Sequence, residues 1–246
     1  MSTSTRTALV TGAGSGIGAS VARALSSDGV RVALVGRRRD ALVDVAARLG
    51  GAVVVAGDIT RDADRIVAEA VGALGGLHVL VNNAGAIRRN LRVHEIDDET
   101  WDAQLAVNLT AHFRVLRAAL PHLMHADGDR SIVSIGSTLV HKMIPGHGAY
   151  AAAKGGLVAL TKQLAVDYGP DGIRANAVLP AVVRTPLAYT DRPDFDERAA
   201  AMAASYPLRR LGEPEDVAAL IAFLASARAA WVTGTVVLAD GGLSVA

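Results

Sequence analysis

The sequence has no cysteine, and this absence excludes disulfide bonds, thiolate catalysis and zinc sites with cysteine ligands. It also lacks an excess of charge of one sign, because 25 Lys and Arg residues face 24 Asp and Glu, a formal net charge of +1. This balance points neither to nucleic acid nor to a membrane surface as a partner. The long uncharged stretch around Gly72–Ile87 contains two asparagines, a histidine and four glycines, so it would make a poor membrane-spanning helix.

The N-terminal residues 1–6 are rich in Ser and Thr and lack the apolar core of a secretion signal. We expect them to form a flexible N-terminus and the protein to be cytoplasmic. Hydrophobic residues make up 51% of the 246 residues and charged residues 20%, which is typical of a compact globular chain. With no linker or repeat in the sequence, we expect one domain spanning 1–246.

Short, mostly apolar, β-branched runs alternate with Ala- and Leu-rich amphipathic stretches along the whole chain. This alternation predicts an α/β fold in which a doubly wound, seven-stranded parallel sheet carries helices on both faces. The predicted strands are Ala8–Thr11, Val32–Val35, Ala52–Ala56, His78–Val81, Ser131–Ile135, Arg174–Val178 and Thr235–Leu238. The predicted helices occupy residues 16–28, 39–49, 62–74, 98–125, 149–168 and 214–226.

The longest predicted irregular segment is 185–207, which contains three prolines among charged residues. A segment of this length inside a compact domain is usually functional, so we interpret it as a substrate lid. His122 and His125 lie three positions apart on a predicted helix, a spacing that can chelate a metal. No third ligand lies near them in the sequence, so we predict no metal site.

A glycine-rich turn, TGAGSGIG at Thr11–Gly18, follows the first predicted strand and opens the first predicted helix. Glycines in this position let backbone N–H groups and a helix N-terminus approach a pyrophosphate that side chains would block. The turn therefore predicts a Rossmann-type dinucleotide site, although a purely structural turn is the alternative for the glycine pattern alone.

The spacing of the glycines at Gly12, Gly16 and Gly18, with the NNAG turn at 82–85 and the pair Tyr150 and Lys154, resembles the short-chain dehydrogenase/reductase family. The resemblance runs through the whole chain in order and ends with GEPEDVA at 212–218 and DGG at 240–242. It implies an oxidoreductase that transfers a hydride between a nicotinamide cofactor and a carbonyl or secondary alcohol. The cofactor-binding residues that it implies are Gly12, Ser15, Gly16, Ile17, Gly18, Arg37, Asp58, Ile59, Asn83, Ala84, Gly85, Tyr150, Lys154, Val183 and Thr185. For Asp58, which would accept from the adenine amino group, a turn or helix-start residue is the alternative.

The second predicted strand ends in Gly36 and is followed by three arginines, where a fold that prefers NAD would carry an acid. A guanidinium at Arg37 would pair with the 2′-phosphate of NADP. A solvated helix entrance is the alternative for Arg38 and Arg39, and the basic residue that some NADP-preferring relatives carry in the glycine turn is replaced by Ser15. We therefore expect NADP(H) as the cofactor, with NAD(H) as the alternative.

Tyr150 and Lys154 lie four positions apart on a predicted helix, which brings their side chains to one face. A lysine ammonium about 6 Å from a phenol favours the phenolate by roughly 2–3 kcal/mol, or about two pKa units. The sequence therefore predicts that Tyr150 exchanges a proton with the substrate oxygen. The resemblance adds a hydrogen bond from Lys154 to the nicotinamide ribose.

The resemblance assigns two further catalytic residues. Ser137 stands thirteen positions before the tyrosine and would donate a hydrogen bond to the substrate oxygen, with Ser134 and Thr138 as competitors. Asn108, in VNLT, would order a water-linked proton relay to Lys154, and the alternative is a buried asparagine that breaks a helix.

The predicted substrate residues are Ser137, Tyr150, Arg88, Arg89, His147 and Leu187. The arginine pair could hold a carboxylate, whereas a solvated loop or a subunit contact is the alternative. Substrates of the 3-oxoacyl-reductase type and of the polyol or sugar-acid dehydrogenase type both suit this arrangement. The loop that would face the nicotinamide has Pro180-Ala181 where the family usually has Pro-Gly, so the resemblance does not specify its backbone path.

The sequence is compatible with three functions. The first is an NADP(H)-dependent oxidoreductase, and the second is an NAD-dependent dehydrogenase of a sugar acid or hydroxy acid. The third is a non-catalytic dinucleotide sensor, which would be expected to lose Tyr150, Lys154 or Ser137, although all three are present. The resemblance also implies a homotetramer.

Overall fold

A seven-stranded parallel sheet forms the centre of the computed structural model, which describes residues 5–190 and 194–246. The strand order is β3-β2-β1-β4-β5-β6-β7, which confirms the predicted doubly wound topology. The strands are β1 Thr7–Thr11, β2 Arg31–Gly36, β3 Val53–Ala56, β4 Val79–Asn82, β5 Arg130–Ile135, β6 Ile173–Pro180 and β7 Val236–Ala239. Because the order reverses between β1 and β4, a crevice is expected at the carboxyl ends of these two strands.

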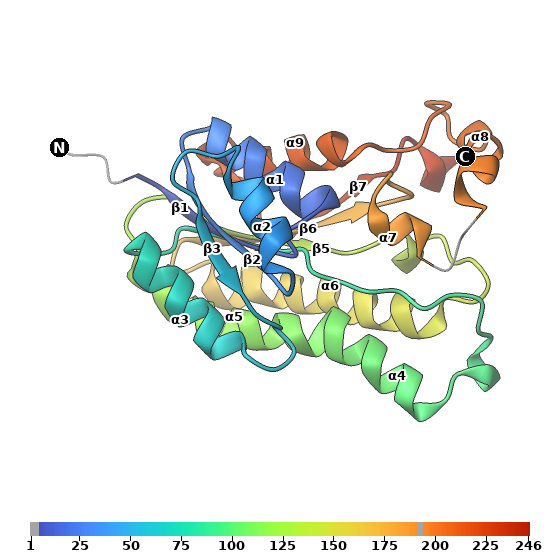
Figure 1. Cartoon of the computed structure of the whole chain (residues 1–246), viewed down its shortest axis with the longest axis horizontal. Helices are drawn as coiled ribbons and strands as arrows, with labels where there is room; N and C mark the ends of the chain where they lie inside the picture. The colour runs from blue at the N-terminus through green and yellow to red at the C-terminus, as the bar shows by residue number, and fades with distance from the viewer. Residues whose placement is uncertain (1–4, 191–193) are drawn as a thin grey trace.

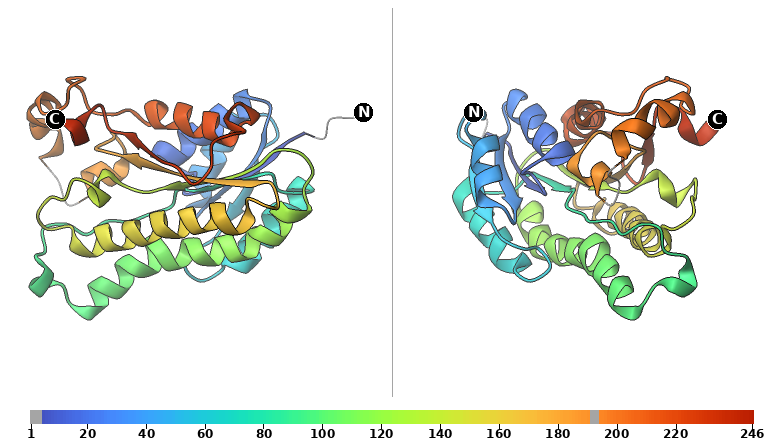
Figure 2. Two further views of the ribbon diagram at one scale, coloured as in Figure 1. Left: turned by 180° about the vertical axis from the view of Figure 1, so that it is seen from behind. Right: turned by 45° about the vertical axis from the view of Figure 1, so that its right-hand side comes forward.

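Helices cover both faces of this sheet (Figures 1 and 2). The helices are α1 Gly16–Ser27, α2 Arg39–Ala46, α3 Ala63–Leu74, α4 Asp98–Leu105, α5 Ala111–His125, α6 Gly148–Tyr168, α7 Pro186–Tyr189, α8 Phe195–Ala204 and α9 Pro214–Ala225. One apolar layer packs α1, α2 and α9 on the sheet, and the second packs α3, α5 and α6 on the opposite face. The side chains of β1, β4 and β6 are buried throughout, as expected of central strands that helices cover on both faces.

Two sequence expectations about regular structure are wrong. The predicted helix 98–125 is divided into α4 and α5 by a π-helical turn at Ala106–Thr110. The segment 185–207, expected to be irregular, contains α7 and α8, and α8 buries Phe195 completely. Proline at the first position of α7 and the apolar side chains of α8 explain why both helices form. Residues 191–193 of the predicted lid lie outside the described residues.

The predicted flexible N-terminus extends over 1–6, and residues 1–4 of it lie outside the described residues. Arg6 is held in place, because its guanidinium donates to Asp129 Oδ2 at 2.7 Å and to the Ala225 carbonyl at 2.7 Å. The expected flexibility therefore does not extend to Arg6. None of the helices in 5–190 and 194–246 is both long and apolar enough to cross a membrane.

Candidate active site

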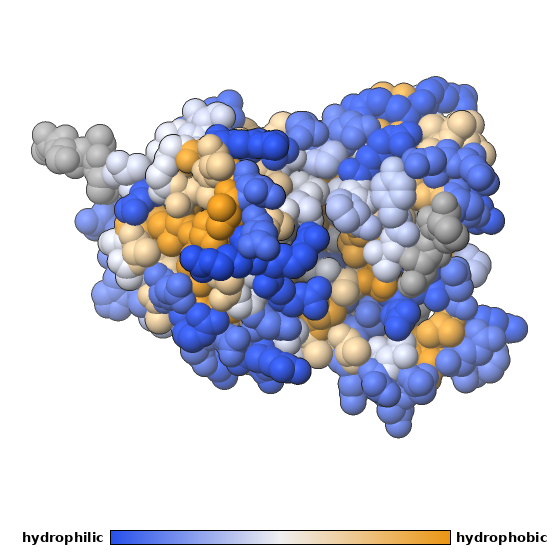
Figure 3. Space-filling model, in the orientation of Figure 1, coloured by the Kyte–Doolittle hydropathy of each residue, from blue (hydrophilic) through white to orange (hydrophobic). Residues whose placement is uncertain are grey.

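A cleft of about 520 Å³ opens at the carboxyl ends of the central strands. Figure 3 shows the surface hollowed between α2 and α7, in the same orientation as Figure 1. The lining includes most of the predicted cofactor residues, namely Gly12, Ser15, Gly16, Ile17, Arg37, Asp58, Ile59, Asn83, Ala84, Gly85 and Thr185. The cleft therefore follows the β1–β4 switch point, where a dinucleotide binds in folds of this type.

The glycine turn approaches its neighbours too closely for side chains. A Cβ atom on Gly18 would lie 2.3 Å from the Gly12 carbonyl oxygen and 2.5 Å from Asn83 Nδ2. Gly12 has φ +67° and Gly16 has φ +54°, a backbone region that favours glycine. The turn is a narrow backbone cradle that fits a pyrophosphate at the start of α1.

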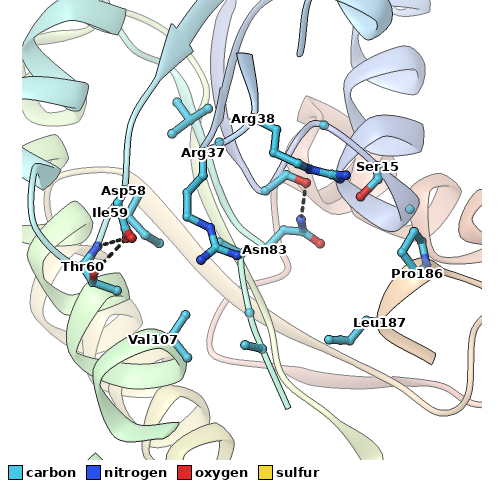
Figure 4. A pocket seen from close by; sticks show the side chains of 18 of the residues that line it. Ser15, Arg37, Arg38, Asp58, Ile59, Thr60, Asn83, Val107, Pro186 and Leu187 are labelled. Atoms are coloured by element: carbon cyan, nitrogen blue, oxygen red, sulfur yellow. Dashed lines mark hydrogen bonds between the residues drawn. The ribbon is translucent and has the colours of Figure 1, made fainter. Parts of the chain in front are cut away.

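The outer end of the cleft carries two arginines and one carboxylate, shown in Figure 4. Arg37 points into the cleft between Asp58 and Asn83, and Arg38 points toward Ser15. Asp58 accepts hydrogen bonds from Thr60 N at 2.9 Å and Thr60 Oγ1 at 2.8 Å. Burial raises the pKa of Asp58, but these bonds and the nearby Arg37 outweigh it, so the pKa lies below its ordinary value.

The turn after β4 is fixed to β1 by hydrogen bonds. The Asn83 backbone N–H donates to Thr11 Oγ1 at 2.9 Å, and its side-chain amide donates to the Thr11 carbonyl at 2.8 Å. The Ala84 N–H donates to the same Thr11 hydroxyl at 3.1 Å. These bonds hold Asn83, Ala84 and Gly85 as one wall of the cleft.

A second cavity of about 350 Å³ adjoins the cleft, because Ile17, Asn83, Gly85, Thr185 and Leu187 line both. It brings together Ser137, Tyr150, Lys154, Arg89, His147, Leu187, Val183 and Thr185 from the predicted sites. Ser137 lines this cavity, as does its competitor Thr138. Ser134 lies on β5 and is completely buried under the helices, outside the residues that line the cavity.

Tyr150 and Lys154 lie on the first turns of α6 and are almost completely buried. The lysine ammonium lies 5.9 Å from the centre of the Tyr150 ring and donates to the Ile135 carbonyl at 2.7 Å. The Tyr150 hydroxyl is hydrogen-bonded to the side chain of Ser137. Phenol, serine hydroxyl and ammonium therefore meet in one cavity, as the sequence predicts.

The electrostatic effect on Tyr150 differs from the sequence expectation. Burial raises the pKa of Tyr150 to about 12, although Arg89 and the Ser137 hydrogen bond act in the opposite direction. Burial also lowers the pKa of Lys154 to about 8. The sequence expectation that Lys154 lowers the phenol pKa is therefore wrong when only the groups of this chain act on Tyr150. Both side chains are deeply buried, and the ammonium donates its hydrogen bond to a backbone carbonyl.

Asn108 lies in the π-helical turn and is completely buried. Its amide donates to the Ala86 carbonyl at 2.8 Å and to the Gln104 carbonyl at 3.1 Å, and its oxygen accepts from Ala86 N at 3.3 Å. A π-turn is frequent at functional sites because it redirects a side chain. Here it directs Asn108 to the loop after β4. Gly85 in this loop lies close to both Asn108 and Lys154, because a Cβ added to Gly85 would be 3.0 Å from Asn108 Oδ1 and 3.7 Å from Lys154 Nζ.

The predicted arginine pair is separated. Arg89 lines the second cavity and donates to the Leu187 carbonyl at 3.1 Å and to the Thr190 carbonyl at the end of α7. Arg88 is exposed, and neither cavity includes it in its lining. The expected double cation is therefore reduced to Arg89, because only this side chain of the two lines a cavity.

His147 is buried at the start of α6, and its Nδ1 donates to the Pro145 carbonyl at 2.8 Å. Thr185 Oγ1 contacts the Val183 carbonyl at 3.4 Å, and Val183 pairs with Gly212 in a short parallel bridge. This pairing holds the loop after β6 in place. The loop is therefore ordered with Ala181 at the position where the family usually has glycine.

The sequence reasoning missed Arg38, Lys142, Met202 and Tyr206, which line one cavity or the other. The run of three arginines at 37–39 is the sequence signal that could have identified Arg38 as a cleft residue. Tyr206 accepts a hydrogen bond from Val182 N at 3.2 Å, and only the folding of α8 against the loop after β6 brings it there. No local pattern in the sequence marks this contact.

Comparison with known proteins supports an enzyme site. The family model described as enoyl-(acyl carrier protein) reductase matches residues 12–244. The chain is 40% identical over 244 residues to cis-4-hydroxycyclohexanecarboxylate dehydrogenase of Sinomonas cyclohexanicum, covering 96% of each. It is 38% identical over 247 residues to 2-(S)-hydroxypropyl-CoM dehydrogenase 3 of Xanthobacter autotrophicus, covering 96% of this chain and 95% of that one. The aldohexose dehydrogenase of Thermoplasma acidophilum has TM-score 0.89 at 29% identity, with 98% of this chain and 94% of that chain covered.

Proposed function

Because the chain belongs to the short-chain dehydrogenase/reductase family and is an NAD(P)-dependent oxidoreductase, we propose that it transfers a hydride between NADP(H) and a carbonyl or secondary alcohol of a small molecule. One observation carries the proposal. Tyr150, Ser137 and Lys154 meet in a cavity that shares its wall with the glycine-lined cleft. A proton donor and a dinucleotide site are therefore adjacent, which hydride transfer to a carbonyl requires.

The nicotinamide, when bound, supplies or accepts the hydride at the carbon of the substrate. Tyr150 then donates its phenolic proton to the carbonyl oxygen, and it takes the proton back when an alcohol is oxidised. Ser137 donates a hydrogen bond to the same oxygen, where negative charge develops. Lys154 holds a positive charge beside the phenol, and Asn108 holds the adjoining loop in position.

The preference for NADP(H) is supported by the outer end of the cleft. Arg37 and Arg38 both line it, and β2 ends in Gly36 without an acid that would repel a 2′-phosphate. Guanidinium groups pair with phosphate oxygens in two parallel hydrogen bonds. Asp58 and Ile59 lie on the opposite side of this end (Figure 4), where they would contact the adenine.

The substrate is proposed to be a small hydroxy or oxo compound with an apolar body. The cavity has Leu187, Ile144 and Met202 in its wall, with Arg89 and His147 as polar groups beside Tyr150. Two relatives described above are named as dehydrogenases of hydroxylated compounds. Their names favour a secondary alcohol and its ketone as the substrate and product. Substrates of the 3-oxoacyl, polyol and sugar-acid types all remain candidates for the assay, and the lid 185–207 would select among them.

The assembly is proposed to be a homotetramer in the cytoplasm. Large apolar side chains are exposed on α4, α5 and α6, among them Trp101, Phe113 and Val166, and Trp231 is fully exposed near β7. These side chains are the candidates for contacts between subunits. Analytical ultracentrifugation would measure the mass, and a monomer at micromolar concentration would contradict the proposal.

The test of the proposed function is Tyr150→Phe, assayed with a panel of ketones and alcohols against NADPH oxidation and NADP⁺ reduction. The variant should bind NADPH nearly as the unaltered protein does, because the phenol hydroxyl is directed at the substrate cavity. Turnover should fall by a factor of about 10² to 10⁴, the usual contribution of a positioned proton donor. Unaltered protein that binds NADPH but turns over no compound would favour the dinucleotide sensor.

A further inference from the structure

Three buried side chains behind the active site have polar atoms without a partner in the described part of the chain. They are the amide of Asn82, with both Nδ2 and Oδ1, the hydroxyl of Ser134, and Nδ1 of His112. Each of the three residues is 0% exposed. Buried polar groups in folded proteins are almost always hydrogen-bonded, so a cluster of four unpaired atoms requires an explanation.

The three side chains lie in one layer of the fold. Asn82 on β4 is in register with Ser134 on the neighbouring strand β5, so both side chains leave the sheet on the same face. Leu80 and Ile132, two positions earlier on the same strands, belong to the apolar layer under α3, α5 and α6. His112 lies on α5 in this layer, which Figure 2 shows below the sheet in its left-hand view.

The hydrogen bonding of His112 fixes which of its nitrogen atoms carries the proton. Burial lowers the pKa of His112 to about 3, and the charge of Lys154 acts in the same direction, so the imidazole is neutral at pH 7. Its Nε2 lies 2.8 Å from the Ala84 carbonyl, which can only accept, so Nε2 carries the proton. Nδ1 is therefore an acceptor with a lone pair directed into the buried layer.

The four atoms have complementary hydrogen-bonding capacity. The Asn82 amide and the Ser134 hydroxyl offer donors, while His112 Nδ1 and Asn82 Oδ1 offer acceptors. A buried water typically makes about three hydrogen bonds to groups of this kind. We propose that Asn82, Ser134 and His112 form an internal binding site for ordered water, between β4, β5 and α5, separate from the water that Asn108 would order.

This water site lies directly behind two walls of the active site. Ser134 precedes Ile135, whose carbonyl accepts the hydrogen bond from Lys154 Nζ. His112 holds the carbonyl of Ala84, which lines the cofactor cleft. The three side chains are positioning residues, because they touch neither substrate nor cofactor and act through Ile135 and Ala84. The water site does not depend on the proposed function, whereas its effect on turnover does.

The first test is a crystal structure of the whole chain at a resolution that shows ordered water. We expect a water within about 3.2 Å of at least two of the three side chains. Direct hydrogen bonds among Asn82, Ser134 and His112 with no water between them would overturn the proposal. This result is independent of any enzyme assay, so it separates failure of the water site from failure of the proposed function.

The second test compares Ser134→Ala, which removes the hydroxyl, with Ser134→Thr, which keeps it. For Ser134→Ala we expect kcat to fall about three- to tenfold, the loss for one hydrogen bond, with KM unchanged within about twofold. Ser134→Thr should restore kcat. Equal kcat in all three proteins, or a loss in both variants that follows Tm, would show a purely structural role and contradict the positioning of Lys154.

Discussion

Replacement of Arg37 by alanine tests the cofactor preference at one residue. The guanidinium lies at the open end of the cleft and close enough to Asp58 to lower the pKa of that carboxyl. Hydrogen bonds to charged groups contribute about 1.5–3 kcal/mol, and the exposure of Arg37 favours the lower end of this range. Since 1.4 kcal/mol is about a factor of ten in Kd, NADPH binding should weaken about tenfold. The loss should be greater if the uncovered Asp58 carboxylate also repels the 2′-phosphate.

The measurement is the Kd of NADPH and of NADH for Arg37→Ala at one ionic strength, because salt screens exposed charges. NADH lacks the 2′-phosphate, so its Kd should change by less than about twofold. Arg39→Ala is the matched control, since Arg39 is exposed at the start of α2 and outside the lining of the cleft. Equal weakening of both cofactors, or an unaltered protein that prefers NADH, would refute the reasoning.

Three other perturbations test the remainder of the site. Ser137→Ala should lower kcat by a factor of about 10² to 10³ with NADPH binding retained, as for the loss of one donor to a developing oxyanion, and an unchanged kcat would assign the role to Thr138. Burial lowers the pKa of Lys154 from its ordinary value of 10.5 to about 8. The unfolded chain therefore binds more protons between these two pH values, and stability should rise with pH in this window. Urea unfolding should show that Lys154→Met removes this rise, and the same slope in both proteins would contradict the burial of a charged lysine. Gly18→Ala should abolish NADPH binding or folding, because its Cβ would lie 2.3 Å from the Gly12 carbonyl oxygen, and normal binding measured by fluorescence would refute the close contact.

The cofactor side of the site could be predicted from the sequence because its parts are local. Gly12, Asn83 and Arg37 follow directly after β1, β4 and β2, and the carboxyl ends of parallel strands meet at one edge of the sheet. Tyr150 and Lys154 share one helix, so their spacing alone brings them together. In each case a short stretch of sequence determines both the residue and its position.

The substrate side could not be predicted in this way. Tyr206 reaches the cavity only because α8 packs beside the loop after β6, and α8 itself was expected to be irregular. Arg88 and Arg89 are adjacent in sequence, yet only Arg89 faces Tyr150. The π-turn at Asn108 has no signal in the apolar periodicity, because a single widened turn changes the phase of a helix without interrupting it.

The pKa values also bear on the direction of proton transfer. A tyrosine with a pKa of about 12 keeps its proton at pH 7, so it is ready to donate to a carbonyl oxygen without any further change. To accept a proton from an alcohol it must first lose its own, and Lys154 at 5.9 Å does not outweigh the burial of the phenol. With the groups of this chain alone, Tyr150 is therefore in the protonated form that carbonyl reduction requires near neutral pH. Oxidation should gain relative to reduction as pH rises, because each alcohol oxidised releases a proton that the solvent must accept.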